Sequence, residues 1–256
     1  MRIATFNCNS VRSRLDAVLR WLADHAPDVL CLQETKAQDA EFPADAFRFA
    51  GWHVAFKGEK SYNGVAIVSK RPADEVSFGL DSEPADPTRL AHARFGLLHV
   101  VDTYVPQGRE IDHAMYAYKL AWFARLKKYF EKHFTPATPL LWCGDLNVAR
   151  NPIDVANPET KKDHVCYHQA CRDAFENVLA FGFTDLFRKH NPELVDYSFY
   201  DYRAPFNPDQ KRGWRVDYVL ATNPLAQKSV GAAIDVVPRT RPKPSDHVPL
   251  YADIRD

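Results

Sequence analysis

Carboxylate, carboxamide and imidazole side chains follow several short apolar runs of this 256-residue sequence. Asp145 and Asn147 alternate directly after the apolar residues 140–143, so a strand that ends there would place both on one face. A carboxylate beside a carboxamide can hold a divalent cation, a water molecule or a phosphate oxygen. Gly144, Asp145 and Asn147 are also typical turn residues, and this stretch alone is compatible with either interpretation.

Polar clusters of this kind recur at other predicted strand ends. The five clusters are Asn7-Cys8-Asn9, Gln33-Glu34-Thr35-Lys36, residues 104–109, residues 144–147 and Ser245-Asp246-His247. Each has an ordinary alternative: a neighbouring glutamate and lysine form a solvated pair in many proteins, and Asp-His pairs are often structural. The recurrence, rather than any one cluster, predicts a functional site.

Asp217 lies in the alternating run 214–220 among apolar residues. A buried aspartate needs a partner. His247 is the partner that the sequence offers.

Composition excludes several classes of protein. The sequence is 46% hydrophobic and 12% aromatic, which favours a packed core over disorder. No apolar run is long enough to span a membrane, and no signal peptide is evident at the start. The five cysteines include no CxxC pair, which is typical of reduced core cysteines in a cytosolic protein. Basic and acidic residues balance at 33 each, so the positive charge for a polyanionic partner must be local.

Hydrophobic periodicity predicts alternating strands and helices. Strands are expected at 2–6, 28–32, 140–143 and 214–220, and hairpins over 52–69 and 89–104. A helix is expected from Val11 with Asn9 or Ser10 as its N-cap, a second after Asp112 as its cap, and a third over 169–180. Residues 149–168 form a long irregular segment, which is usually a functional loop. No linker divides the chain, so a single domain over residues 1–256 is expected.

Two stretches indicate an internal duplication. Residues 3–9 and 140–147 both place a polar-x-Asn triplet after a strand. Two strand–helix units related in this way would stack two sheets face to face with their helices outside. The predicted fold is therefore α/β, a four-layer αββα sandwich with pseudo-twofold halves.

Seven ordered motifs resemble the exonuclease III family, the metal-dependent abasic-site endonuclease branch of the endonuclease/exonuclease/phosphatase superfamily. The motifs are Asn7-x-Asn9, Leu32-Gln33-Glu34-Thr35-Lys36, Tyr62-x-Gly64-Val65, Tyr104-x-Pro106, Gly144-Asp145-x-Asn147, Gly213-Trp214-Arg215-Val216-Asp217-Tyr218 and Ser245-Asp246-His247-x-Pro249. They cover essentially the whole chain. The Lys36-bearing segment and the segment around Trp214 set this branch apart from looser relatives such as deoxyribonuclease I.

The resemblance implies a Mg²⁺-dependent reaction, in which Mn²⁺ is expected to substitute. It implies that Glu34 is the principal metal ligand, with Asn7 and Asp246 in or near the coordination shell. Asp145 would orient or deprotonate the attacking water, and Asn147 would hold water or phosphate.

The other implied roles concern the phosphate and the DNA. Tyr104 and His247 would contact the phosphate, and Asp217 would fix the imidazole and favour its protonated form. Contacts to DNA are expected from Asn9, Arg12, Lys36, Tyr62, Asn63, Gln107 and Arg203. Residues 197–203, which include Arg203, are interpreted either as an aromatic stacking platform or as an edge strand.

The sequence departs from the family in the loop 161–168. His164 stands where the family usually has asparagine, Val165-Cys166 replaces a small residue and glycine, and Ser10 replaces a glycine in the first loop. The predicted sugar pocket and specificity wall comprise His164, Val165, Tyr167, His168, Phe199, Trp214 and Val216. A bulkier wall would exclude a flipped-out abasic sugar and leave the phosphate chemistry intact.

The predicted function is therefore 3′-end processing of double-stranded DNA, as a 3′→5′ exonuclease and 3′-phosphatase, with weakened incision at internal abasic sites. A full abasic-site endonuclease is the alternative within the enzymes. A catalytically silent DNA- or protein-binding member is the alternative of another class. The expected partner is duplex DNA with 3′ ends, nicks or abasic sites, and the expected protein is a cytoplasmic monomer without membrane contact.

Overall fold

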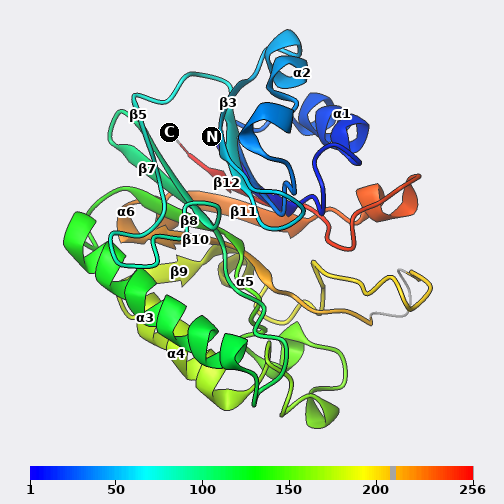
Figure 1. Cartoon of the computed structure of the whole chain (residues 1–256). Helices are drawn as coiled ribbons and strands as arrows, with labels where there is room; N and C mark the ends of the chain where they lie inside the picture. Colours follow the sequence, from blue (N-terminus) through cyan, green and yellow to red (C-terminus); the bar gives the residue numbers. More distant parts are fainter. Residues whose placement is uncertain (208–211, 256) are drawn as a thin grey trace.

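The computed structural model describes residues 1–207 and 212–255, and within them two six-stranded sheets pack face to face (Figure 1). Sheet A has the spatial order β11 (Ser229–Ile234), β12 (Leu250–Ile254), β1 (Arg2–Asn7), β2 (Val29–Gln33), β4 (Val65–Ser69) and β3 (His53–Lys57). Sheet B has the order β5 (Glu75–Phe78), β6 (Leu90–Phe95), β7 (Leu98–Tyr104), β8 (Leu140–Asp145), β10 (Asp217–Thr222) and β9 (Phe183–Asp185).

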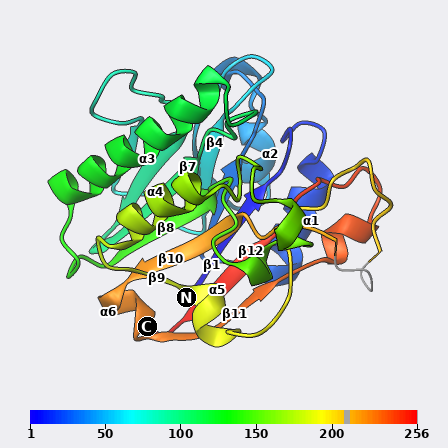
Figure 2. The ribbon, with the colours of Figure 1, turned by 90° about the horizontal axis from the view of Figure 1, so that it is seen from below.

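Helices cover the outer face of each sheet. α1 (Leu15–His25) and α2 (Ala44–Phe49) cover sheet A, where Trp21 and Phe47 pack against Phe6 and Leu32. α3 (Ala114–His133) and α4 (Gln169–Leu179) lie side by side over sheet B, as Figure 2 shows. Two shorter helices, α5 (Leu186–His190) and α6 (Asn223–Ala226), follow β9 and β10. The four-layer αββα sandwich is thus confirmed.

β8 is wholly buried, and its alternating side chains enter two hydrophobic cores, one on each face of sheet B. Trp142 packs under α3 and α4, whereas Leu141 and Cys143 contact the inner face of sheet A. All five cysteines are buried and free, as expected of core thiols. In the described part of the chain, no helix is long and apolar enough to cross a membrane.

The two sheets share one pairing pattern, but the repeat differs from the predicted one. Each sheet contains one parallel pair, β1–β2 in sheet A and β7–β8 in sheet B, and every other pairing is antiparallel. The units that correspond are therefore β1–α1–β2 and β7–α3–β8. Matching residues 3–9 to residues 140–147 was wrong, because β8 occupies the place of β2 rather than that of β1.

Helix starts also differ from the predictions, and tertiary contacts are the reason. The amides of Ser10 and Val11 donate to the carbonyls of Glu34 and Thr35, so residues 8–11 pair with the end of β2 and α1 begins only at Leu15. His113, not Asp112, caps α3, because its Nδ1 accepts from the Met115 amide at 3.0 Å. The predicted strand 214–220 begins at Asp217.

Candidate active site

Strand register places three candidate side chains in one row across sheet B. Asp145 at the end of β8 lies opposite Tyr104 on parallel β7 and opposite Asp217 on antiparallel β10. Gly144 makes this row possible: its φ is +142°, and a Cβ there would lie 1.9 Å from the Thr103 carbonyl oxygen. The row faces Asn7 and Glu34, which end β1 and follow β2 in sheet A.

A cavity of about 360 Å³ opens over this row. The residues that line it are Glu34, Tyr104, Gln107, Asp145, Asn147, Lys161, His164, Cys166, Phe199, Asp201, Arg203, Trp214, Val216, Asp246 and His247. Four of the five predicted strand-end clusters contribute side chains to this lining. The fifth, residues 7–9, does not, but the side-chain amide of Asn7 lies beneath the cavity.

Asn7 joins the two sheets at the base of the cavity. Its Nδ2 donates to Glu34 Oε1 at 2.8 Å and to Asp145 Oδ2 at 2.9 Å. Its Oδ1 accepts from the Asn9 backbone amide at 3.0 Å. The side chain therefore holds two carboxylates together, while direct metal ligation by Asn7 stays a prediction.

His247 lies between two aspartates. Its Nδ1 is 2.8 Å from Asp217 Oδ2 and its Nε2 is 3.7 Å from Asp145 Oδ2. Burial alone would lower the pKa of His247, but the negative charges of Asp217 and Asp145 outweigh it and raise the pKa to about 10. The imidazole is therefore a cation at neutral pH, with Asp217 as the counter-charge that the sequence predicted.

Asp145 is a buried carboxyl group in the centre of the row. Burial raises its pKa to about 7; His247 opposes the rise, and the charges of Asp217 and Glu34 add to it. The Asn147 amide donates to Asp145 Oδ1 at 3.0 Å, and the Asn147 side chain donates to the Val105 carbonyl at 3.0 Å. Asp145 and Asn147 thus lie together, and the left-handed backbone at Asn147 (φ +50°) is the turn that brings this about.

Glu34 is ionised and held from two sides. Burial would raise its pKa, but the charge of Lys36 and the hydrogen bonds from Lys36 and Asn7 lower it. Lys36 Nζ is 2.7 Å from Glu34 Oε2 and 2.6 Å from Asn9 Oδ1. Asn9 in turn donates to Asp246 Oδ1 at 2.9 Å, so the first and last polar clusters of the chain meet here.

Tyr104 completes the polar lining. Burial raises the pKa of its hydroxyl well above the usual value, and the negative charges of Glu34 and Asp145 raise it further. The phenol is therefore a neutral hydrogen-bond donor, suited to a phosphate oxygen.

The aromatic part of the cavity agrees with the predicted sugar pocket only in part. Phe199, Trp214 and Val216 line it, and the ring of His164 contacts that of Trp214 in a tilted arrangement, with centroids 4.5 Å apart and 37° between the planes. Partial burial of His164, together with the charges of Lys119 and Lys161, lowers its pKa to about 4, so this ring is neutral.

Three predicted wall residues point away, and their assignment was wrong. Val165 is buried behind the cavity, Tyr167 packs against Ala149 and Val155, and His168 Nδ1 lies 2.7 Å from the Tyr116 hydroxyl. The amides of residues 167 and 168 both donate to the His164 carbonyl, and this tight turn leaves only alternate side chains facing inward.

Lys161, Cys166 and Asp201 line the cavity but were not predicted as site residues. Cys166 Sγ lies 3.8 Å from Asn147 Oδ1. The signal for Cys166 was present, because it stands where the family usually has glycine. Nothing in the sequence singled out the other two.

The predicted DNA contacts occupy different depths. Gln107 and Arg203 line the cavity, and Asn9 and Lys36 lie in its hydrogen-bonded base. The Arg12 side chain is 51% exposed and Tyr62 is 71% exposed. The Asn63 side chain donates a hydrogen bond to Glu59. The segment 197–203 forms no strand; Tyr197 and Tyr200 are buried, so only Tyr202 and Arg203 of this segment are exposed.

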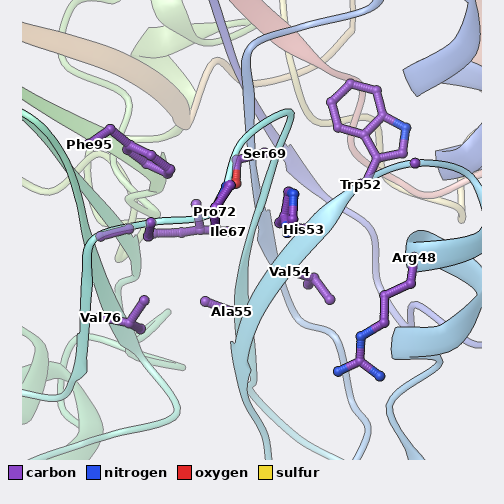
Figure 3. Close-up of a pocket in the computed structure, with 13 residues that line it drawn as sticks. Arg48, Trp52, His53, Val54, Ala55, Ile67, Ser69, Pro72, Val76 and Phe95 are labelled. Carbon is purple, nitrogen blue, oxygen red and sulfur yellow. The ribbon is translucent and has the colours of Figure 1, made fainter.

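A larger hollow, of about 520 Å³, lies between the two sheets at their β3 and β5 edges (Figure 3). Its lining includes Trp52, Val54, Ile67, Phe95 and Arg48. None of the described residues that line it carries a carboxylate. The smaller cavity, not the larger, therefore has the groups for phosphate chemistry.

Comparison with known proteins agrees with this site. Residues 4–247 match the model of the Endonuclease/Exonuclease/phosphatase family, and the chain belongs to that family. It is 31% identical over 270 residues to exodeoxyribonuclease III of Haemophilus influenzae, with both chains fully covered. The sequence-based assignment to the exonuclease III branch, whose members are hydrolytic nucleases, is confirmed.

Two groups of solved structures are more similar still. An AP endonuclease from Archaeoglobus fulgidus is 48% identical with a TM-score of 0.98, and both chains are fully covered. The 3′–5′ exonuclease NExo from Neisseria meningitidis is 36% identical with a TM-score of 0.96 over both full chains. A Neisseria 3′ phosphatase NExo variant bound to product DNA hairpin is 35% identical with a TM-score of 0.94, again over both full chains.

The residues present fit a metal ion. Ligand atoms of Glu34, Asp145 and His247 all lie within 4.8 Å of one another. Glu34 and Asp145 offer carboxylate oxygens, whereas Nδ1 of His247 is already engaged by Asp217. Oxygen donors around excess negative charge suit a hard divalent cation.

Proposed function

We propose that this protein is a Mg²⁺-dependent DNA-repair phosphodiesterase that removes nucleotides and phosphates from 3′ ends of duplex DNA. The observation that carries the proposal is the row Tyr104–Asp145–Asp217 with protonated His247 above it and Glu34 opposite. The row and its neighbours thus bring carboxylates, the His247 cation and the neutral Tyr104 hydroxyl together at one small cavity. Relatives named as exonuclease, 3′ phosphatase and AP endonuclease support DNA as the substrate.

Each residue of the site would have a separate role in the hydrolysis. Glu34, with Asp246 nearby, would hold the cation; a bound Mg²⁺ would neutralise the phosphate and stabilise the departing 3′ oxygen. Asp145 Oδ2 would accept the proton of the attacking water, for which its raised pKa suits it. His247 Nε2 and the Tyr104 hydroxyl would donate to the phosphate oxygens as negative charge builds. Hydrolysis then leaves a 3′-hydroxyl on the DNA.

The ring of His164 against Trp214 supports weak incision of internal abasic sites. It occupies the aromatic side of the cavity with Trp214, where a flipped sugar would enter. A terminal nucleotide can present its phosphate without full extrusion, whereas an internal abasic sugar cannot. Overpacking by one or two heavy atoms costs ~1–3 kcal/mol, or about tenfold to a hundredfold in rate.

A full AP endonuclease is the second candidate. The 48% identity to the Archaeoglobus protein named as an AP endonuclease favours it. One comparison separates the candidates: Mg²⁺-dependent cleavage of an internal abasic duplex against digestion of a recessed 3′ end. Glu34→Gln, expected to be inactive on both, is the blank. Abasic incision as fast as 3′ trimming would establish the second candidate.

We predict that His164→Ser raises abasic incision by about tenfold or more and leaves 3′ trimming within about twofold, because it removes the imidazole ring that contacts Trp214. His168→Ser is the matched control, since that ring faces Tyr116 and lies outside the cavity. Both rates are measured on the two substrates under single-turnover conditions. Equal gains from the two variants would contradict a wall formed by His164.

A further inference from the structure

A buried lysine lies directly beneath the active site. Lys119, in the second turn of α3, is 0% exposed. Its Nζ donates to three backbone carbonyls: Asn147 at 2.6 Å, Val165 at 2.8 Å and Gln107 at 3.2 Å. An ammonium group has three donors, so each of its hydrogens has one acceptor.

These three acceptors belong to three different loops of the active site. Gln107 follows β7, Asn147 follows β8, and Val165 lies between the cavity residues His164 and Cys166. The stem of the lysine is packed as tightly as its head, since a Cβ at Gly108 would lie 3.4 Å from both Lys119 Cδ and Val165 Cβ. One side chain thus joins segments that are distant in sequence and meet only at the site.

The absence of a counter-ion distinguishes this lysine from Arg215, a cation that is also 0% exposed. Arg215 pairs with Asp154 at 2.7 Å and Asp185 at 2.8 Å. Among the ion pairs of the described residues, none includes Lys119. The three acceptors of its hydrogen bonds are carbonyl dipoles rather than carboxylates, so it leaves a positive field under a cavity that must accept an anionic phosphate. The charge of Lys119 adds to the lowering of the His164 pKa that burial causes. It also opposes the rise that burial causes in the pKa of the Cys166 thiol, and both effects agree with such a field.

We propose that Lys119 is a positioning residue for phosphate hydrolysis: it fixes the loops of Gln107, Asn147 and His164 relative to one another and places a positive charge below the phosphate. The loss of kcat on its removal rests on the proposed function, whereas the fixing of the loops does not. Because a small misplacement of reacting groups can cost about 10² in rate, its main effect falls on kcat rather than on KM.

The variants separate hydrogen bonds, charge and general stability. Lys119→Met keeps the length of the stem and removes all three donors, and we expect kcat on a recessed 3′ end to fall by about 10²-fold with KM changed less than threefold. Lys119→Gln keeps two donors and is expected to be intermediate. If the methionine variant does not fold, the glutamine variant provides the test, with the same expected direction of change in kcat. Leu126→Ala is the control, a buried residue of the same helix: its unfolding midpoint should fall while kcat stays within about twofold.

Hydrogen exchange gives a readout that needs no activity. Lys119→Met should speed amide exchange in residues 105–109, 146–149 and 164–168 together, and Leu126→Ala should not. Unchanged exchange in these loops, an unchanged kcat in an active enzyme, or the same kcat loss in Leu126→Ala would each overturn the proposal. If the unmodified protein cleaves none of the DNA substrates, the proposed function fails, and the exchange measurement still decides whether Lys119 fixes the loops.

Discussion

Asp145 and Asp102 are buried carboxyl groups on adjacent parallel strands of one sheet, and burial raises the pKa of both. Their neighbours differ. Asp102 lies between the sheets, where one oxygen accepts from Gln33 Nε2 at 2.6 Å and the other has no partner among the described residues. Asp145 has Asn7, the Asn147 amide and the cationic His247, and it lines the cavity.

Burial alone therefore does not make a reactive carboxylate. Adjacent strands thus hold one buried carboxyl group, Asp102, that costs stability and another, Asp145, that is a candidate base. The two differ because Asp145 has a cationic neighbour and faces the cavity. The variants that follow test this difference directly.

The largest effect is expected for Asp145→Asn, which removes the proton acceptor and one of the carboxylates facing the cation. Single-turnover cleavage of a recessed 3′ end should fall by at least about 10³-fold. Asp102→Asn, measured in the same assay, should stay within about twofold of the unmodified protein. Comparable losses in the two variants would remove the functional distinction between the two carboxyl groups.

Asp217→Asn should have the next largest effect, about 10²-fold in kcat, because His247 loses the carboxylate that orients and charges it. Asp217 raises the pKa of His247, so its loss lowers that pKa and the imidazolium deprotonates at a lower pH. The alkaline limb of the plot of kcat against pH should move to lower pH. A full rate with an unmoved limb would show that the two residues are not coupled.

A smaller effect, on stability rather than on rate, is expected for Asp102→Asn. The pKa of Asp102 in the fold lies above its unfolded value, so the fold favours the protonated form and loses stability as pH rises through the folded pKa. The amide imitates the protonated acid and should gain about 1–2 kcal/mol over the unmodified protein at pH 8 and little at pH 4. Thermal unfolding at the two pH values, at about 2–4 °C per kcal/mol, measures this. A gain that does not grow with pH would contradict a raised pKa at Asp102 in the fold.

Ser10→Gly should have the smallest effect. Ser10 has a φ of +87°, a conformation that favours glycine, and glycine is what the family usually has there. Relief of this strain should stabilise the fold by about 1 kcal/mol. Denaturant unfolding provides the measurement, and Ser13→Gly, in the exposed turn before α1, is the control that should bring no gain.

The sequence predicted the layers and the chemical core of the site, because both depend on local signals. The apolar run of β8 and the polar residues that end it are contiguous, so periodicity could place Asp145 and Asn147 on one face, and the recurrence of such strand ends indicated a functional site. Asp217 and His247 were paired by the argument that a buried acid needs a partner.

What could not be predicted depends on contacts between distant segments. The direction of the side chains in 164–168 follows from a turn and from the bond between the Val165 carbonyl and Lys119, neither of which has a sequence pattern. Lys119 itself occupies an ordinary helical position among apolar residues. The short edge strands β5 and β9 carry little alternation to detect.

The amide of Asn7 touches a carboxylate from each sheet, so the proposed catalytic centre is complete only when the two sheets are docked. Sheet B is built from one uninterrupted stretch of chain, whereas sheet A takes its first and its last strands from opposite ends of the sequence. During synthesis, Glu34 and Asp145 both exist before His247 has been made. On the proposed roles, a growing chain should therefore cleave no DNA before His247 has been made and β12 has paired with β1.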